Sequence, residues 1–213
     1  MNVDRFLREL PALFDDYPRS ERPRDDRFRR VLDEVPGLAT ENCLALVNLA
    51  AACLAPGEAY VEAGSFRGTS LIAAGLGNDV PLVGIDRFSM EGSDRATLEE
   101  NLARFGLAAR IVEGEVREAL SAGALAGRRI GVFYYDAEHT REALLGALGL
   151  VEPLLAPRAL IVVDDSDWER VARAIEEYLV GEPRASLAVH LRGKDHDAPQ
   201  WWEGVQVLSW EAG

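Results

Sequence analysis

Short apolar runs and amphipathic stretches alternate along most of the chain. Five runs rich in β-branched and aromatic residues predict strands, and a stretch with apolar residues at helical spacing follows each one. The predicted strands are Ala59–Ala63, Leu82–Asp86, Arg110–Glu113, Ile130–Asp136 and Leu160–Asp164. The predicted helices are Arg67–Leu76, Asp94–Phe105, Val116–Ala122, Thr140–Leu155 and Asp167–Leu179. This alternation is typical of βαβ units, so we expect an α/β fold with a parallel sheet covered by helices on both faces.

The C-terminal part departs from this alternation. Residues 185–193 and 203–210 form two further strand patterns with no helical stretch between them. Two consecutive strands of this kind pair most simply as antiparallel neighbours, so we expect them at one edge of the sheet. The sequence therefore predicts one α/β domain over residues 41–213.

The N-terminal part is irregular. Apolar residues at helical spacing predict a short helix that includes Val3, Phe6 and Leu10, and Pro11 then opens a charged, proline-rich stretch. Thr40 is a plausible N-cap for a largely apolar helix that follows it. We interpret residues 1–40 as a helix and an exposed arm, which is either a solvated tail or a lid over a substrate pocket.

Charge and cysteine content narrow the function classes. The chain has 213 residues, a net charge of −13 and a pI near 4.7. That balance weighs against nucleic-acid or membrane partners and favours a small-molecule ligand. Cys43 and Cys53 form no C-x-x-C motif, and no signal-like or membrane-spanning apolar run is present. We therefore expect a cytoplasmic protein, and the sequence leaves open whether it forms a homo-oligomer.

In such sheets, ligands bind beyond the carboxyl ends of the strands. The first strand ends in VEAGSFRGTS, which supplies Glu62, Gly64, Ser65 and Gly68. The glycines allow a sharp turn and a close ligand approach, but the G-x-G-x-x-G spacing of a dinucleotide site is missing. An acidic residue before the turn would repel a pyrophosphate and attract a cationic ligand. The alternative is a tight turn that binds nothing.

Acidic residues also follow the next two strands. Asp86 ends the second strand, where a carboxylate can accept hydrogen bonds from both ribose hydroxyls. Glu115 follows the third strand and can lie near an adenine edge. Either residue can instead cap a helix or face solvent. Taken in order with the glycine turn, these acids indicate an adenosine ligand without phosphates.

The fourth and fifth strands end in a denser set of polar residues. Asp136 and His139 follow the fourth strand, and Asp164 and Asp165 end the fifth. Three carboxylates at one rim are costly unless they share a proton or a cation, and hard oxygen ligands suit Mg²⁺. The alternatives are that the aspartate pair caps the next helix and that His139 caps a helix or holds a backbone carbonyl.

These motifs resemble the class I S-adenosyl-L-methionine-dependent methyltransferases. The resemblance covers Ala59–Trp210 through VEAGSFRGTS, VGIDRF, YYDAEHT and ALIVVDDSDW, and it is strongest toward the bacterial, metal-dependent small-molecule O-methyltransferases of macrocin type. It implies a Rossmann-like seven-stranded sheet with a reversed C-terminal strand pair. Pro157-Arg158-Ala159 departs from a usual Pro-Gly-Gly turn, far from the chemistry.

The resemblance also implies roles for single residues. Glu62, Gly64, Ser65 and Gly68 would belong to the first cofactor motif, and Asp86 to the ribose position. Asp136, Asp164 and Asp165 would bind the metal, and His139 would act as the base. Catechol-type relatives use a lysine as the base, but the one lysine of this chain, Lys194, lies in the last loop.

We therefore predict an S-adenosylmethionine-dependent O-methyltransferase that acts on a hydroxyl of a small molecule of sugar or natural-product type, assisted by Mg²⁺ and His139. The alternatives are a metal-independent O- or N-methyltransferase and a non-catalytic module that binds an adenosine ligand. We interpret His190 as structural and His196 as solvated. Trp201 and Trp202 either wall the acceptor pocket or pack against the edge strands.

Overall fold

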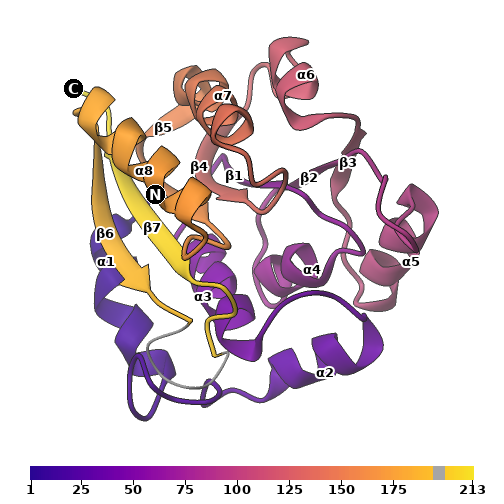
Figure 1. Cartoon of the computed structure of the whole chain (residues 1–213). Helices are drawn as coiled ribbons and strands as arrows, with labels where there is room; N and C mark the ends of the chain where they lie inside the picture. Colours follow the sequence, from indigo (N-terminus) through magenta and orange to yellow (C-terminus); the bar gives the residue numbers. More distant parts are fainter. Residues whose placement is uncertain (194–199) are drawn as a thin grey trace.

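A single mixed sheet forms the centre of the computed structural model (Figure 1), which describes residues 1–193 and 200–213. Within these residues, seven strands lie in the order β3-β2-β1-β4-β5-β7-β6. Their bounds are β1 Glu58–Ala63, β2 Leu82–Asp86, β3 Arg110–Glu113, β4 Arg129–Tyr135, β5 Leu155–Val163, β6 Ala185–Leu191 and β7 Val205–Glu211. Strands β1 to β5 are parallel, and β7 is antiparallel to both β5 and β6. The predicted fold class is confirmed, including the reversed C-terminal pair.

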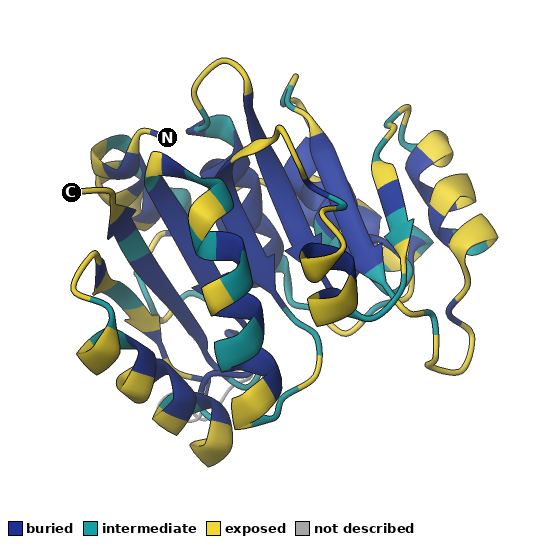
Figure 2. Cartoon of the chain, turned by 90° about the horizontal axis from the view of Figure 1, so that it is seen from above, coloured by how far each residue is buried: buried dark blue, intermediate teal, exposed yellow. Residues whose placement is uncertain are grey.

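Helices cover both faces of the sheet. Their bounds are α3 Glu41–Ala52, α4 Thr69–Gly75, α5 Arg95–Arg104, α6 Val116–Ser121, α7 Arg141–Val151 and α8 Glu169–Gly181, with a 3-10 turn η2 at Glu152–Leu154. Figure 2 shows the strands buried between these layers, while the helices turn exposed residues outward. The near-continuous apolar strands of the sequence are explained by this burial on both faces.

Alternate residues of the central strands enter two separate cores. Tyr60 and Val132 pack with α3 and α4 on one face, whereas Val61 and Phe133 pack with α7 and α8 on the other. This period of two follows from the strand geometry. Strand β5 begins at Leu155, earlier than the predicted Leu160, because Leu155 pairs with Ile130 of β4 before the register shifts.

The N-terminal segment packs onto the sheet domain. It contains α1 (Val3–Glu9), a 3-10 turn η1 (Leu10–Leu13) and α2 (Arg27–Glu34), a helix that the sequence analysis did not predict. Phe6, Phe14 and Phe28 are at most 3% exposed and belong to the same core as α3. The segment is therefore not a solvated tail, because its apolar side chains anchor it, although most residues between Asp15 and Arg27 are exposed. Its action as a lid stays a prediction.

Thr40 begins α3 as predicted, because its side chain accepts a hydrogen bond from the Cys43 amide. The same hydroxyl donates to the carbonyl of Gln200 at 2.7 Å, which ties the start of α3 to the segment before β7. Both cysteines are free thiols in the buried interior. Among the described residues, no helix has the length and apolar character that crossing a membrane would require.

Candidate active site

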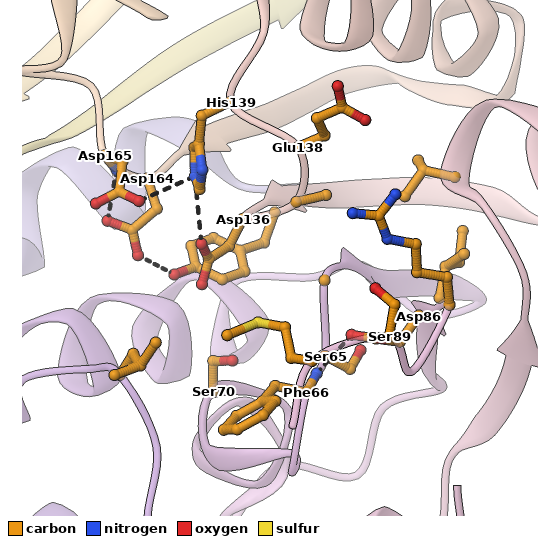
Figure 3. A pocket seen from close by; sticks show the side chains of 18 of the residues that line it. Ser65, Phe66, Ser70, Asp86, Ser89, Asp136, Glu138, His139, Asp164 and Asp165 are labelled. Carbon is orange, nitrogen blue, oxygen red and sulfur yellow. Dashed lines mark hydrogen bonds and ion pairs between the residues drawn. The ribbon is translucent and has the colours of Figure 1, made fainter. Parts of the chain in front are cut away.

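A cavity of about 510 Å³ opens at the carboxyl ends of β1 to β5 (Figure 3). Eight of the ten predicted site residues line it, and the other two, Glu62 and Gly68, lie outside its wall. The lining residues among the predictions are Gly64, Ser65, Asp86, Glu115, Asp136, His139, Asp164 and Asp165. Residues from five strand ends, separated by up to 101 positions between Gly64 and Asp165, therefore meet at one site.

Gly64 makes the first turn possible. Its φ is +92°, and an added Cβ would lie 1.8 Å from the carbonyl oxygen of Asp136. The Gly64 amide donates to Ile85 at 2.8 Å, and the Asp136 amide donates to Ala63 at 2.9 Å. The turn after β1 thus packs directly against the backbone of the β4 end, which only glycine permits.

Glu62 is fully buried beneath this turn. It accepts a hydrogen bond from the Tyr60 hydroxyl at 2.9 Å, but its Oε1 atom has no hydrogen-bond partner among the described residues. Burial raises the pKa of Glu62 to about 8, although nearby hydroxyls oppose that shift. The hydroxyl of Ser65 is also buried without a partner. Both polar atoms thus lack a partner among the described residues, but only Ser65 also lines the cavity, whereas Glu62 lies behind its wall.

Gly68 has a structural role. It has a φ of +89° and stands at the N-cap of α4, and its amide donates to the Ser65 carbonyl at 2.7 Å. This left-handed position closes the turn and starts the helix. A direct contact between Gly68 and a cofactor stays a prediction.

Asp86 organises two strained backbone positions. Its carboxylate accepts hydrogen bonds from the amides of Phe66 at 2.7 Å and Phe88 at 2.6 Å. Both phenylalanines have positive φ values, 45° and 50°. Backbone strain of this kind persists only where the surroundings hold it, and it clusters at ligand sites. Each carboxylate oxygen has two lone pairs, so Asp86 can still accept bonds from a ligand.

Glu115 caps helix α6. Its side chain accepts hydrogen bonds from the amides of Arg117 at 2.8 Å and Glu118 at 3.2 Å. The capping alternative is therefore confirmed for Glu115. Because the residue also lines the cavity, its predicted contact with an adenine stays open to test.

An acidic cluster forms where β4 and β5 end. His139 Nε2 lies 2.9 Å from Asp165 Oδ2 and 3.7 Å from Asp136 Oδ1, and Figure 3 shows the imidazole between the two carboxylates. One ligand atom from each of Asp136, His139 and Asp165 lies within 4.8 Å of the others. His139 Nε2 and Asp165 Oδ1 are buried and have no partner with hydrogen-bond geometry among the described residues. The cluster thus offers free donor atoms for a cation.

Asp164 lies beside this cluster but faces Tyr134. One of its oxygens accepts a hydrogen bond from the Tyr134 hydroxyl, and the other accepts one from the Asp165 amide at 2.9 Å. Burial, followed by the nearby charge of Asp136, raises the pKa of Asp164 to about 8. The structure therefore does not bring Asp164 into the three-residue group, and its assignment as a metal ligand stays a prediction.

Both helix-cap alternatives at this rim are wrong. Helix α8 begins at Glu169, after Trp168, and no side chain caps it. Asp164 and Asp165 thus do not serve as its N-cap. Thr140 supplies the N-cap of α7, where its hydroxyl accepts from the Ala143 amide, so His139 does not cap that helix.

The electrostatics of the cluster depend on His139. Burial lowers the pKa of His139, but the carboxylates of Asp136 and Asp165 outweigh burial and raise it to about 9. Burial raises the pKa of Asp136, and contact with His139 opposes that change. With no cation bound, the imidazole is therefore protonated at neutral pH and neutralises part of the acidic charge.

The two adjacent tryptophans have different roles. Trp201 is fully buried, packs edge-on against Phe14 at 5.4 Å and donates to the Pro18 carbonyl at 2.8 Å. Trp202 is partly exposed and lines the cavity. Packing is therefore confirmed for Trp201, against the N-terminal segment rather than an edge strand, and the pocket wall is confirmed for Trp202.

Sequence reasoning missed several residues of the site. Trp168 lines the cavity with its ring centroid 4.9 Å from that of His139, and Leu38 and Ala39 reach the cavity from the segment before α3. No motif marks Leu38 or Ala39, and Trp168 ends the quoted ALIVVDDSDW motif without having been assigned a role. His190 lies within β6, 3.5 Å from an Asp167 oxygen, as expected of a structural residue. Lys194 and His196 fall outside the described residues.

A family model described as a methyltransferase domain matches residues 61–166, the segment that carries all these strand ends. The matched segment is a methyltransferase domain. A search of curated protein sequences found no match. The methyltransferase sheet of the chain, with its reversed C-terminal pair, is shared with solved O-methyltransferase structures.

Three of these solved structures illustrate the likeness. The O-methyltransferase of Bacillus cereus in complex with SAH is 16% identical, with 89% of this chain and 92% of that chain covered and a TM-score of 0.63. TomG of Streptomyces achromogenes, an O-methyltransferase involved in tomaymycin synthesis, is 18% identical, with 89% and 91% covered and a TM-score of 0.64. CalS11, a TDP-rhamnose 3′-O-methyltransferase of calicheamicin biosynthesis, is 19% identical, with 97% and 94% covered and a TM-score of 0.58. At such identities the likeness establishes the fold.

Proposed function

We propose that this methyltransferase transfers a methyl group from S-adenosyl-L-methionine to a hydroxyl of a small-molecule acceptor. One observation carries the proposal: a single cavity joins the glycine turn and Asp86 at one end to Asp136, His139 and Asp165 at the other. Such a cavity can hold a cofactor and an acceptor side by side. The solved relatives support it, because several are named O-methyltransferases and two were solved with SAH or SAM.

The cofactor end offers partners for each part of the cofactor. The unpartnered oxygen of Glu62 and the hydroxyl of Ser65 suit the amino group of the methionine moiety. Asp86 has lone pairs left for the ribose hydroxyls, and Glu115 lies at the cavity wall after β3. Gly64 brings the backbone close enough for the ligand to lie against it.

The donor set of the acidic cluster fits a divalent cation. Asp136 and Asp165 provide carboxylate oxygens, and Asp165 Oδ1 is buried with no partner. Asp164 would add a third carboxylate ligand to this site if its side chain rotated away from the Tyr134 hydroxyl. Bound Mg²⁺ would supply a Lewis acid that holds the acceptor hydroxyl and lowers its pKa. The alternative of a metal-independent enzyme leaves three buried or half-buried carboxylates without a chemical role.

His139 is the base in this proposal. Its Nε2 atom faces the cavity cluster and would take the proton of the acceptor hydroxyl. The Asp165 carboxylate fixes the orientation of the imidazole and stabilises the charged ring after the proton has moved. Trp168 packs beside the imidazole and shields it from water. Nε2 of His139 cannot bind a cation and accept a proton at the same time. An experiment can therefore decide whether His139 is the base or a ligand of the cation.

Cofactor binding is the first test. SAH should raise the melting temperature of the protein, because a ligand at 100 times its Kd stabilises the fold by about 2.7 kcal/mol, whereas NAD should leave it unchanged. Asp86→Ala should remove most of the SAH shift. Glu113→Ala, at the exposed end of the neighbouring strand β3, is the matched control and should retain the shift. Equal stabilisation by NAD, or none by SAH, contradicts the proposal.

Cation binding separates the roles of His139. Mn²⁺ replaces Mg²⁺ as a paramagnetic probe, and its bound fraction is read by electron paramagnetic resonance. Asp165→Asn should weaken Mn²⁺ binding about tenfold or more, since a charged ligand is lost. His139→Gln should bind Mn²⁺ about as well as the wild type but should lose roughly 10²- to 10⁴-fold in turnover. If His139→Gln instead abolishes Mn²⁺ binding, His139 is a ligand and not the base.

A further inference from the structure

Exposed apolar side chains gather around the cavity. The described residues include six large hydrophobic side chains that are exposed, and three of these, Leu38, Met90 and Trp202, line the cavity. Leu38 is 58% exposed and Trp202 is 38% exposed. Apolar surface that collects at a concave site marks an area that a ligand covers.

Leu38 and Trp202 belong to one wall of the cavity. The Thr40 hydroxyl donates to the Gln200 carbonyl at 2.7 Å, so the segment that carries Leu38 is tied to the segment that carries Trp202. Trp202 has a φ of 51°. A tryptophan in this left-handed conformation is strained and must be held there by its surroundings, as residues at ligand sites often are.

This wall lies at the acceptor end. The Ser166 amide donates to the Gly204 carbonyl at 3.0 Å, which joins the Trp202 segment to the loop after β5. That loop also carries Trp168, whose ring lies beside His139. Trp168 and the segment of Trp202 therefore lie on the side of the base, while the segment that carries Leu38 also contacts Thr69 at the start of α4.

The cavity offers little to an anionic acceptor. Its acidic lining residues are Asp86, Glu115, Asp136, Glu138, Asp164 and Asp165. Arg87 is the one arginine among the lining residues, and none of them is a lysine. Arg87 follows β2, two strands from β4 and three from β5 in the sheet order, so roughly 10–14 Å of sheet separates its strand end from the two strand ends that carry the acidic cluster. Phosphate recognition needs arginine or lysine close to the bound group, and the described residues of this wall include neither.

We propose that the acceptor is an uncharged, flat, hydroxylated ring compound, and that Leu38 and Trp202 select it over phosphorylated acceptors such as nucleotide sugars. The ring faces would lie against Trp202, Leu38 and Trp168, with the hydroxyl directed to His139. Aromatic side chains favour stacked or edge-on contact with such rings, and Trp202 offers a partly exposed face for it. The inference rests on the proposed function, because it names the acceptor of that same site.

A matched pair of probes tests the inference without turnover. 2-Naphthol and 2-naphthyl phosphate share one ring system and differ in charge. Each is titrated calorimetrically into the protein saturated with SAH, with chelator present so that no cation contributes. 2-Naphthol should bind at least about tenfold more tightly than its phosphate, because the wall buries the ring and no described residue of the wall pairs the phosphate.

Variants locate the binding surface. Trp202→Ala should weaken 2-naphthol binding about tenfold, and Trp202→Phe should restore most of it, because the aromatic face returns. Leu38→Ala should also weaken binding. Leu187→Ala is the matched control, since Leu187 is 48% exposed but lies outside the cavity, and it should bind as the wild type does.

Two failures are distinguishable. If SAH binds but 2-naphthyl phosphate or thymidine diphosphate rhamnose binds more tightly than 2-naphthol, the inference is overturned and the proposed function stands. An unchanged affinity in Trp202→Ala overturns the assignment of the wall in the same way. If SAH does not raise the melting temperature of the protein, the proposed function is overturned and the inference falls with it.

Discussion

Replacing Gly64 with alanine perturbs the contact that joins the two halves of the site. The residue has a φ of +92°, and the new Cβ would meet the carbonyl oxygen of Asp136 at 1.8 Å. A left-handed conformation costs a non-glycine residue about 1–2 kcal/mol. The overlap involves backbone atoms, so the ends of β1 and β4 must separate, at a further cost of about 1–3 kcal/mol. We expect Gly64→Ala to lower the free energy of unfolding by roughly 2–5 kcal/mol in total.

Gly57→Ala is the matched control. Gly57 also has a positive φ, +83°, but nothing lies within 4 Å of its added Cβ. This variant should lose only the conformational part, about 1–2 kcal/mol. Urea unfolding measures both losses, and calorimetry measures SAH affinity for each variant. Gly64→Ala should bind SAH at least about tenfold more weakly, because the turn moves, while Gly57→Ala should bind it normally. Equal stability losses and unchanged SAH binding in both variants would refute the reasoning.

Two further predictions concern the acidic rim. Tyr134→Phe leaves an oxygen of Asp164 buried without its hydroxyl partner, so it should destabilise the fold by about 1–3 kcal/mol in urea unfolding. The control Tyr135→Phe removes only the hydrogen bond to the carbonyl of Glu138 and should cost less stability. An equal or smaller loss in Tyr134→Phe would show that the hydrogen bond from Tyr134 does not hold Asp164. The folded pKa of His139 is raised to about 9, above the usual 6.5, so its stabilisation is complete below pH 6.5 and is lost as pH rises through 9. In chelator, wild-type stability should therefore fall relative to His139→Gln by roughly 3 kcal/mol between pH 6 and 10, and a constant difference across that range would contradict the pairing of His139 with Asp136 and Asp165.

The sheet could be predicted from the sequence because its strands are buried on both faces. Runs such as Ile130–Asp136 carry β-branched and aromatic residues without polar interruption, and only a central strand requires that pattern. Strand ends then follow from strand positions, which is why Asp86, Asp136 and Asp165 could be placed at one rim. The start of β5 at Leu155 depends on pairing with Ile130, a tertiary contact that no local pattern encodes.

Long-range packing decided what the sequence left open. Charge and proline around Phe14 and Phe28 suggested an exposed arm, yet both side chains are buried against distant parts of the chain. Trp201 and Trp202 are adjacent and chemically identical, and only the contact of Trp201 with Phe14 assigns one to the core and the other to the cavity. The sequence likewise gives no reason to distinguish Asp164 from Asp165. The difference between them comes from the hydrogen bond that the Tyr134 hydroxyl donates to Asp164.

Methyl transfer itself is measured with S-adenosylmethionine that carries a deuterated methyl group, mixed with 2,3-dihydroxynaphthalene, Mg²⁺ and enzyme. The diol combines the uncharged ring that the cavity wall favours with a hydroxyl pair. Mass spectrometry of the product should show one deuterated methyl group on one oxygen, formed with an equal amount of SAH, and at least about a hundredfold more slowly with His139→Gln. Formation of SAH with no labelled acceptor, or labelling at the same rate in His139→Gln and wild type, would contradict the proposed transfer to a hydroxyl activated by His139.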